Sequence, residues 1–291
     1  MRFDYGFTSH YLTLSPGRIH YLDEGQGTPV VLVHGNPTWS YYYRDLVTQL
    51  AHRYRVVVPD HIGCGLSDKP AKYDYTLENH IDNLLSLLDH LSIRQTSMVV
   101  HDWGGPIGLG AVVEGGIELE KLVILNTAAY RSTRIPLRIR ICRWPVLGKL
   151  LVQGLNGFSR AAIFMAVHKR MSWETARGYL YPYDTWSHRR AIYEFVRDIP
   201  LHSAHRSHAT LVRIEKSLVK IDESRIPVGV FWGGKDFCFD DYYFDQWKLH
   251  LPQAHYRYFK EWGHYLLEDG KGSIEKIIED FLSDNQVVPN E

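Results

Sequence analysis

Short apolar runs alternate with segments of helical spacing along most of the chain. An antiparallel hairpin is predicted over residues 10–23, and further strands are predicted at 29–34, 55–59, 97–101, 121–126, 227–232 and 255–259. Helical spacing is found at 41–51, 77–91, 105–115, 241–250 and 273–283. Strands that alternate with helices form mostly parallel sheets covered on both faces. The pattern therefore predicts an α/β fold whose eight-stranded, mostly parallel sheet is flanked by helices.

The alternation stops between Asn126 and Pro227. The residues between them have helical periodicity and many Arg and aromatic side chains, with no strand-like run. We interpret this segment as an inserted helical cap, with residues 129–221 in the cap and residues 1–128 and 222–291 in the core. Because the ends of two core strands bound the insertion, cap and core are expected to share one cleft.

The overall charge excludes some classes of partner. The 291 residues include 33 Lys and Arg and 33 Asp and Glu, so no net field draws the chain to nucleic acid. A small hydrophobic substrate, with water as the second reactant, is expected instead. Residues 1–5 hold an acid and aromatics rather than a signal sequence, and no run approaches the ~18 apolar residues of a membrane span. A cytoplasmic location is therefore predicted.

The thiols and a run of histidines do not indicate a metal site. Cys64, Cys142 and Cys238 are widely spaced and form no CxxC pattern, which argues against a disulfide framework and against zinc. His202, His205 and His208 recur every three residues, but that spacing drifts around a helix of 3.6 residues per turn. No metal or other cofactor is predicted.

The run VVHDWGG at residues 99–105 lies where a predicted buried strand meets a helix. In α/β-hydrolases this sharp turn exposes a nucleophile, and small residues beside it let strand and helix pack closely. Asp102 occupies the nucleophile position, and the chain has no GxSxG. A desolvated, aligned carboxylate attacks sp³ carbon and forms an ester. The alternative is that Asp102 only caps the next helix, since Asp is a favoured N-cap residue.

An ester on Asp102 needs a base that activates water for its hydrolysis. His264, in EWGHY after the last predicted strand, is in the place where this fold carries its histidine. Asp236, in GGKD after the preceding strand, is the candidate acid that orients the imidazole, and it completes the order nucleophile, acid, histidine. Asp240 and Asp241 are alternatives for the acid, but they are expected to cap the following helix.

The segment His34-Gly35-Asn36-Pro37 ends an earlier core strand. This fold takes one oxyanion donor from the backbone N–H at this place and another from the residue after the nucleophile. These donors would belong to Asn36 and Trp103. Their side chains, an amide and an indole, could also converge on a leaving anion such as halide. The alternative is that Trp103 only packs and that Asn36 is only a turn residue.

With the motifs HGNPTWSYYYR (34–44), DHIGCGLSDKP (60–70), HDWGGPIG (101–108), GGKD (233–236) and GHY (263–265), the sequence resembles the haloalkane dehalogenases. The resemblance implies that Asp102 is the nucleophile, His264 the base and Asp236 the acid, with Asn36 and Trp103 holding the halide. The combination of Asn36 with Asp236 is similar to the third dehalogenase subgroup. That subgroup is similar to the β-lactone decarboxylases of bacterial olefin synthesis, which LNTAAY (125–130) and YPYDTW (181–186) also resemble.

Three rival interpretations are less favoured. Epoxide hydrolases protonate the epoxide oxygen with cap tyrosines, for which Tyr179, Tyr181, Tyr183 and Tyr193 are candidates. Fluoroacetate dehalogenases place an Arg after the nucleophile, where this chain has Trp103. A binding protein without catalysis would be expected to lose a member of the triad, and none is lost.

The cap segment from Arg131 to Arg143 holds five Arg and no acid. We interpret it as a solvated face of a cap helix. The alternatives are docking of an acyl chain carrier, of an anionic membrane surface or of an acidic partner protein.

Overall fold

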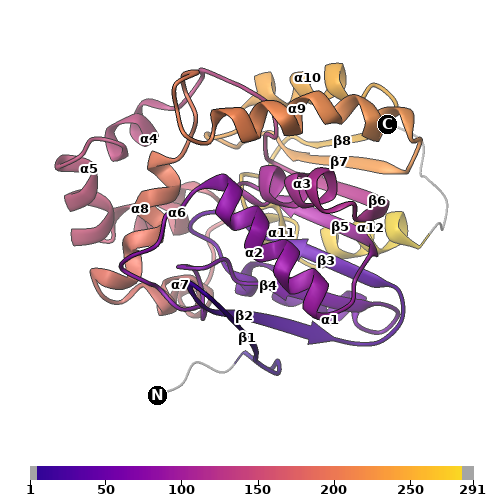
Figure 1. Ribbon diagram of the computed structural model, residues 1–291, viewed down its shortest axis with the longest axis horizontal. Helices are drawn as coiled ribbons and strands as arrows, with labels where there is room; N and C mark the ends of the chain where they lie inside the picture. Colours follow the sequence, from indigo (N-terminus) through magenta and orange to yellow (C-terminus); the bar gives the residue numbers. More distant parts are fainter. Residues whose placement is uncertain (1–4, 284–291) are drawn as a thin grey trace.

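The computed structural model describes residues 5–283, with an eight-stranded sheet at the centre (Figure 1). The strand order is β1-β2-β4-β3-β5-β6-β7-β8, and all neighbours are parallel except the pairs that β2 forms with β1 and β4. The strands are β1 (His10–Leu14), β2 (Gly17–Glu24), β3 (Pro29–Val33), β4 (Arg55–Pro59), β5 (Gln95–His101), β6 (Glu118–Leu125), β7 (Val228–Gly233) and β8 (His255–Phe259). The predicted fold class is confirmed.

Helices cover both faces of the sheet because its inner strands are apolar on both sides. Val30 to Val33 of β3 and Leu122 to Leu125 of β6 are fully buried, whereas the edge strand β1 alternates between half-buried and exposed positions. One apolar cluster joins the sheet to α2 (Leu77–His90), α3 (Gly104–Gly115), α9 (His208–Glu223) and α10 (Asp241–His250). The other includes η1 (Ser40–Tyr43), α1 (Arg44–Leu50), α11 (Leu266–Asp269) and α12 (Ile274–Leu282).

The segment between β6 and β7 folds mainly into short helices at one end of the molecule, at the left of Figure 1. They are α4 (Leu137–Cys142), α5 (Leu147–Lys149), η2 (Leu150–Gly154), α6 (Gly157–Met165), α7 (Trp173–Leu180), η3 (Tyr181–Tyr183), η4 (Ser187–Arg189) and α8 (Arg190–Arg197).

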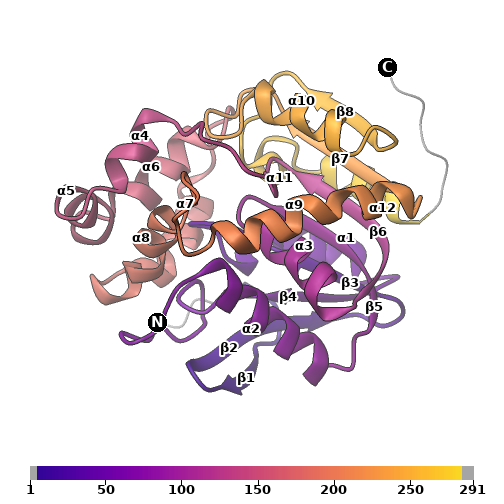
Figure 2. The ribbon, with the colours of Figure 1, turned by 45° about the horizontal axis from the view of Figure 1, so that its top comes forward.

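The last helix of this segment, α9, packs beside α2 and α3 of the core (Figure 2). Its residues Leu211, Ile214 and Leu218 belong to the same apolar cluster as the sheet. The predicted cap, residues 129–221, includes most of α9. We therefore propose to draw the boundary between cap and core before α9, and we refer to α4 to α8 as the cap.

Two local features differ from the predicted elements. The helix expected at 41–51 begins as the 3₁₀ turn η1 and becomes α-helical at Arg44, and the short helix α11 was not predicted. In residues 5–283, no helix combines the length and the apolar character needed to cross a bilayer.

Candidate active site

The turn from β5 into α3 holds Asp102 in an unusual backbone conformation. Its φ is +51°, a left-handed value that few residues other than Gly adopt. Two glycines permit the close approach around it. A Cβ on Gly35 would lie 2.1 Å from Asp102 Oδ1, and a Cβ on Gly104 would lie 1.9 Å from the carbonyl oxygen of Val33. Any larger residue at these two positions would displace the carboxylate or the helix.

The carboxylate of Asp102 is buried and bound at one oxygen. Oδ1 accepts a hydrogen bond of 2.6 Å from the backbone N–H of Asn36. Among the described residues, the Asp102 side chain accepts no hydrogen bond from the N–H of Gly104 or Gly105 in the first turn of α3, so the capping contact that was the alternative is not made. Burial raises the pKa of Asp102, while the His264 imidazole and the backbone N–H groups of Asn36 and Trp103 oppose the rise.

His264 lies between two carboxylates. Its Nδ1 is 2.7 Å from Asp236 Oδ2, and its Nε2 is 3.7 Å from Asp102 Oδ2. Because an ionised carboxylate only accepts, Nδ1–H must donate to Asp236, which leaves Nε2 unprotonated in the neutral ring. Burial lowers the pKa of His264, but the Asp236 and Asp102 carboxylates together raise it above its usual value. Asp240 instead accepts from the backbone N–H of Tyr242 at the start of α10, as expected.

Asn126, at the end of β6, ties these groups together, and sequence reasoning missed this role. Its Nδ2 donates to Asp236 Oδ2 at 2.9 Å, and its Oδ1 accepts from the N–H of Gly233 at 2.8 Å. Its backbone oxygen accepts from the N–H of Asp102 at 3.2 Å. The next residue, Thr127, donates its hydroxyl to the Asp102 carbonyl. The only signal in the sequence was a polar residue directly after a buried strand.

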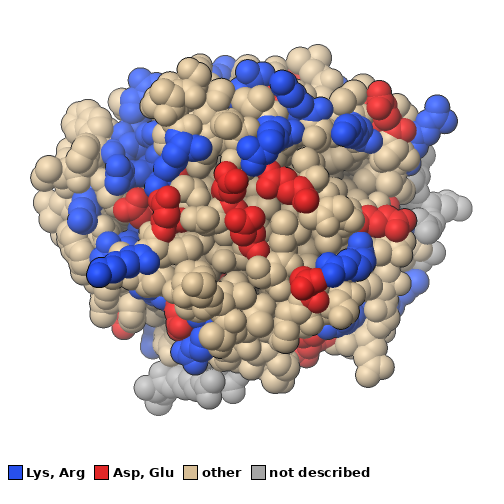
Figure 3. All heavy atoms as spheres, in the orientation of Figure 1, with Lys and Arg blue, Asp and Glu red and all other residues tan. Residues whose placement is uncertain are grey.

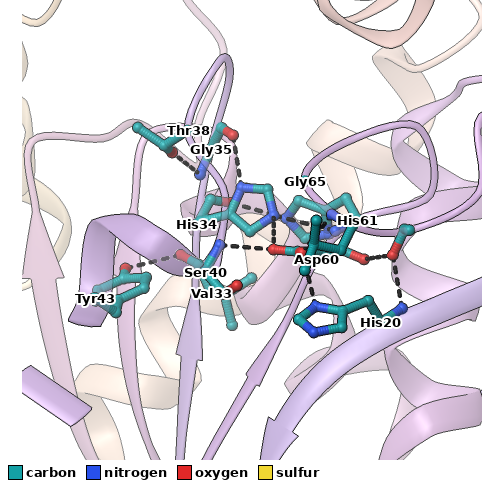
Figure 4. A network of polar contacts seen from close by, with 12 residues as sticks. His20, Val33, His34, Gly35, Thr38, Ser40, Tyr43, Asp60, His61 and Gly65 are labelled. Atoms are coloured by element: carbon teal, nitrogen blue, oxygen red, sulfur yellow. Dashed lines mark hydrogen bonds and ion pairs between the residues drawn. The ribbon is translucent and has the colours of Figure 1, made fainter. Parts of the chain in front are cut away.

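A buried polar network beneath the Asn36 loop centres on Asp60, at the end of β4 (Figure 4). Asp60 Oδ1 accepts from the backbone N–H of Ser40 at 2.6 Å, and Oδ2 accepts from His20 Nδ1 and from the N–H of Leu66, both at 2.8 Å. Burial opposes ionisation, but His20 and the other partners hold the pKa of Asp60 below its usual value. The buried Asp60 carboxylate thus holds the C-terminal end of the Asn36 loop, at Ser40.

His34 extends the network to the N-terminal end of the Asn36 loop, at Gly35. Its Nδ1 bonds to the carbonyl of Gly35 at 2.7 Å, and its Nε2 accepts from the backbone N–H of His61 at 3.1 Å. Burial lowers the pKa of His34, which keeps the ring neutral in this arrangement. The loop between the two anchors carries the N–H of Asn36 that binds Asp102. Its position is therefore set by residues outside the triad.

Asp102, His264, Asn36 and Trp103 open onto a cavity of about 140 Å³ between core and cap. The rest of the wall is mostly apolar and includes Leu77, Pro106, Ile139, Phe158, Ala162, Leu211 and Phe239. Such a site accepts a small hydrophobic molecule and strengthens electrostatic interactions with its few polar groups.

The two predicted side-chain donors are placed differently. The Nδ2 of Asn36 donates to the carbonyl oxygen of Ile192 in the cap at 3.2 Å, so one of its two hydrogens is engaged. The indole N–H of Trp103 has no hydrogen-bond partner among the described residues, and its ring lies 5.3 Å from that of Phe195. Trp103 is therefore the freer of the two donors.

The four tyrosines considered for epoxide protonation do not line this cavity. The hydroxyl of Tyr179 donates to Glu268, and that of Tyr193 lies within hydrogen-bond distance of the carbonyls of Trp144 and Pro145. Tyr183 bonds to core backbone groups, and Tyr181 is partly exposed. This arrangement does not support the epoxide hydrolase interpretation.

The sequence matches the family described as alpha/beta hydrolase fold over residues 28–271. The chain belongs to this family. The cis-3-alkyl-4-alkyloxetan-2-one decarboxylase of Shewanella oneidensis is 42% identical over 97% of this chain and 90% of its own length. The corresponding protein of Xanthomonas campestris is 39% identical over 97% of this chain and 98% of its own. Haloalkane dehalogenase 2 of Mycobacterium bovis is 42% identical, but over 42% of this chain and 43% of its own length.

Solved structures give the same fold. Haloalkane dehalogenase DbeA from Bradyrhizobium elkani superposes with a TM-score of 0.87 at 21% identity, covering 96% of this chain and 98% of that one. DatA from Agrobacterium tumefaciens gives a TM-score of 0.86 at 23% identity, covering 97% and 98%. The predicted resemblance to dehalogenases and β-lactone decarboxylases is confirmed. The chain therefore belongs to a hydrolase-fold family of enzymes.

Proposed function

We propose that Asp102 is the nucleophile of an enzyme that forms a covalent ester with its substrate. The observation that carries this proposal is the different environment of the two carboxylate oxygens. Oδ1 is held by the backbone N–H of Asn36, whereas Oδ2 is 3.7 Å from His264 at the cavity wall. Oδ2 is thus available for attack on an sp³ carbon. The oxygen that develops negative charge in the second step is Oδ1, which already has a donor.

His264 acts in the second step as a general base. Water attacks the Asp102 carboxyl carbon, and Nε2 takes the proton while Asp236 stabilises the imidazolium that forms. The gap of 3.7 Å between Nε2 and Oδ2 is too long for a direct hydrogen bond and suits a base that works on water beside the ester. Collapse of the tetrahedral intermediate releases an alcohol and restores the carboxylate.

The site supports haloalkane dehalogenation as the overall reaction. Asp102 Oδ2 bonds to the carbon as the carbon–halogen bond breaks, and the electron pair leaves with the halide. The Trp103 indole N–H and the second hydrogen of the Asn36 amide would donate to that anion. Two neutral donors bind halide without a cation that would quench the nucleophile, each contributing about 1.5–3 kcal/mol.

A second candidate is decarboxylation of a β-lactone, favoured by the two decarboxylase relatives that match 97% of this chain, cap included. Asp102 Oδ2 would attack the sp³ ring carbon that is bonded to the ring oxygen, and that C–O bond would break to free the lactone carboxylate. The C–C bond to this carboxylate then breaks and carbon dioxide leaves. The electrons of that bond form the alkene as the C–O bond to Asp102 breaks and releases the Asp102 carboxylate. This route consumes no water.

One experiment separates the two candidates. The enzyme is incubated separately with a bromoalkane and with a cis-dialkyl β-lactone, and the rates of bromide and alkene release are measured. Faster bromide release supports the dehalogenase, and faster alkene release supports the decarboxylase. Absence of both products would contradict the proposed nucleophile.

The cytoplasmic location stays a prediction.

A further inference from the structure

The first part of the cap and the segment that leads into it carry basic residues without any acid. Residues 131 to 173 contain nine Lys and Arg and no Asp or Glu, so the rest of this neutral chain has a formal charge of −9. Figure 3 shows Lys and Arg gathered at the upper left of this face, near the end where Figure 1 places α4 and α5. A charge distribution of this kind orients a protein in the field of an anionic surface.

Not all of these cations are available to a partner. Arg131 pairs with Glu215 and Arg134 with Asp240, and Arg143 donates to two backbone carbonyls. Arg140, on α4, is exposed and has no ion pair among the described residues. Docking through residues 131 to 143, the alternative to a solvated helix face, therefore has to rest on the part of the segment that begins with α4.

Large apolar side chains are exposed from the start of α4 to Leu150. Six positions within residues 137–150 define what we call the cap patch: Leu137, Arg140, Trp144, Val146, Leu147 and Leu150. Leu137 is 69% exposed and Val146 is 82% exposed. Leu137 and Arg140 lie on α4, Leu147 on α5 and Leu150 at the start of η2, while Trp144 and Val146 lie between α4 and α5. The helices α4 and α5 contact each other so closely that a Cβ on Gly148 would lie 2.1 Å from the carbonyl oxygen of Cys142. The exposed apolar side chains are therefore carried by one compact unit.

The cap patch is next to the cavity. Ile139, on the opposite side of α4 from its exposed neighbours, is buried and lines the cavity, as do Ile135 and Pro136 just before the helix. A single short helix thus separates the cavity from the cap patch. Exposed Trp and aliphatic side chains beside Arg and Lys, without any acid, are typical of segments that insert into the head-group region of a bilayer.

We propose that the cap patch docks the enzyme onto an anionic phospholipid bilayer. Leu137, Val146 and Leu150 enter the head-group region, while Arg140 contacts lipid phosphates. Lys149, which is exposed beside the cap patch with its ammonium 5.9 Å from the centre of the Trp186 ring, does the same. This surface goes beyond the proposed function. One consequence does rest on the proposed function: apolar substrate would pass from the bilayer into the cavity.

The test measures binding of the full chain to vesicles by sedimentation. Wild-type protein should bind vesicles that contain phosphatidylglycerol more strongly than vesicles of phosphatidylcholine alone, and high salt should weaken the binding. The double variants Val146→Ser/Leu150→Ser and Arg140→Glu/Lys149→Glu should each lower the partition coefficient at least about tenfold. Circular dichroism checks that both variants fold.

Matched controls come from the core. Leu249→Ser removes a leucine that is 73% exposed on α10, and Lys220→Glu reverses an exposed charge on α9, and neither should change vesicle binding. Equal loss in the controls, unchanged binding in the cap variants, or no preference of wild type for anionic vesicles would overturn the proposal. Binding of an acidic protein but of no vesicle would also overturn it. The assay contains no substrate, so its outcome is independent of the proposed catalysis.

Discussion

The core side and the cap side of the cavity are built in different ways. On the core side, Asp102, Asp236 and His264 follow strand ends. Asn36 donates to Asp102, Asn126 donates to Asp236, and His264 bonds to Asp236. On the cap side, short helices contribute mainly apolar side chains such as Ile139 and Phe158. The core side therefore determines which bond can be broken, and the cap side determines which molecule fits. Substitutions on the two sides should have effects of different kinds and sizes.

The largest effect is expected on the core side from Asp102→Ala. No other side chain at the elbow can form the ester, so turnover of any substrate should fall by at least about 10⁴-fold. Product release under saturating substrate measures it. Normal turnover by this variant would rule out the mechanism. Slow recovery in Asp102→Asn does not count, since deamidation would restore the carboxylate.

A smaller effect is expected from Trp103→Phe, which removes the indole N–H and keeps an aromatic ring. If this donor holds a leaving halide, carbon–halogen cleavage should slow by about 10- to 1000-fold. Halide should also quench tryptophan fluorescence of the wild type and do so less in the variant. Unchanged cleavage and unchanged quenching would remove the halide role and favour the lactone reaction.

The pH dependence should show a moderate effect on the hydrolytic step. His264 must be neutral to accept a proton, and its pKa is raised above the usual 6.5. The base form is therefore present above the raised pKa and is lost as pH falls through it, by about tenfold per pH unit. The acid limb of turnover should lie lower than this pKa, because the Asp102 ester has lost the charge that helps to raise it. In the resting enzyme, NMR titration of the His264 imidazole should have its midpoint above pH 6.5. A midpoint below pH 6.5 would disagree with the ring environment described above.

The smallest effect on the chemistry is expected on the cap side. Ile139→Ala enlarges the cavity wall and should change the ratio of kcat/KM between long and short bromoalkanes by about tenfold, with little change in kcat for the better substrate. Leu137→Ala on the same helix is the matched control, because that side chain is exposed. A loss of kcat like that of Trp103→Phe would mean that the cap takes part in bond breaking.

The same contrast explains what could be predicted from the sequence. Buried strands such as β3 and β6 are continuous apolar runs, and the elbow has a recognisable motif. The strands, and the order of the candidate nucleophile, acid and histidine along the chain, could therefore be anticipated. The cap helices are short, and tertiary packing rather than periodicity sets their ends, as at α5 and η2. Asn126 and Asp60 could not be assigned their roles, because the contacts that give them those roles join distant segments.

The most direct test of the central claim, that Asp102 forms a covalent ester, is intact-mass and peptide mass spectrometry of His264→Gln with a bromoalkane. Without the base, the first step should still occur once, releasing about one bromide per active site and leaving the alkyl group on Asp102. In ¹⁸O water, wild-type enzyme should place the label in the Asp102 carboxylate before a later turnover passes it to the alcohol. If His264→Gln accumulates no adduct and a single wild-type turnover puts ¹⁸O straight into the alcohol, water attacks the substrate directly and Asp102 is not the nucleophile.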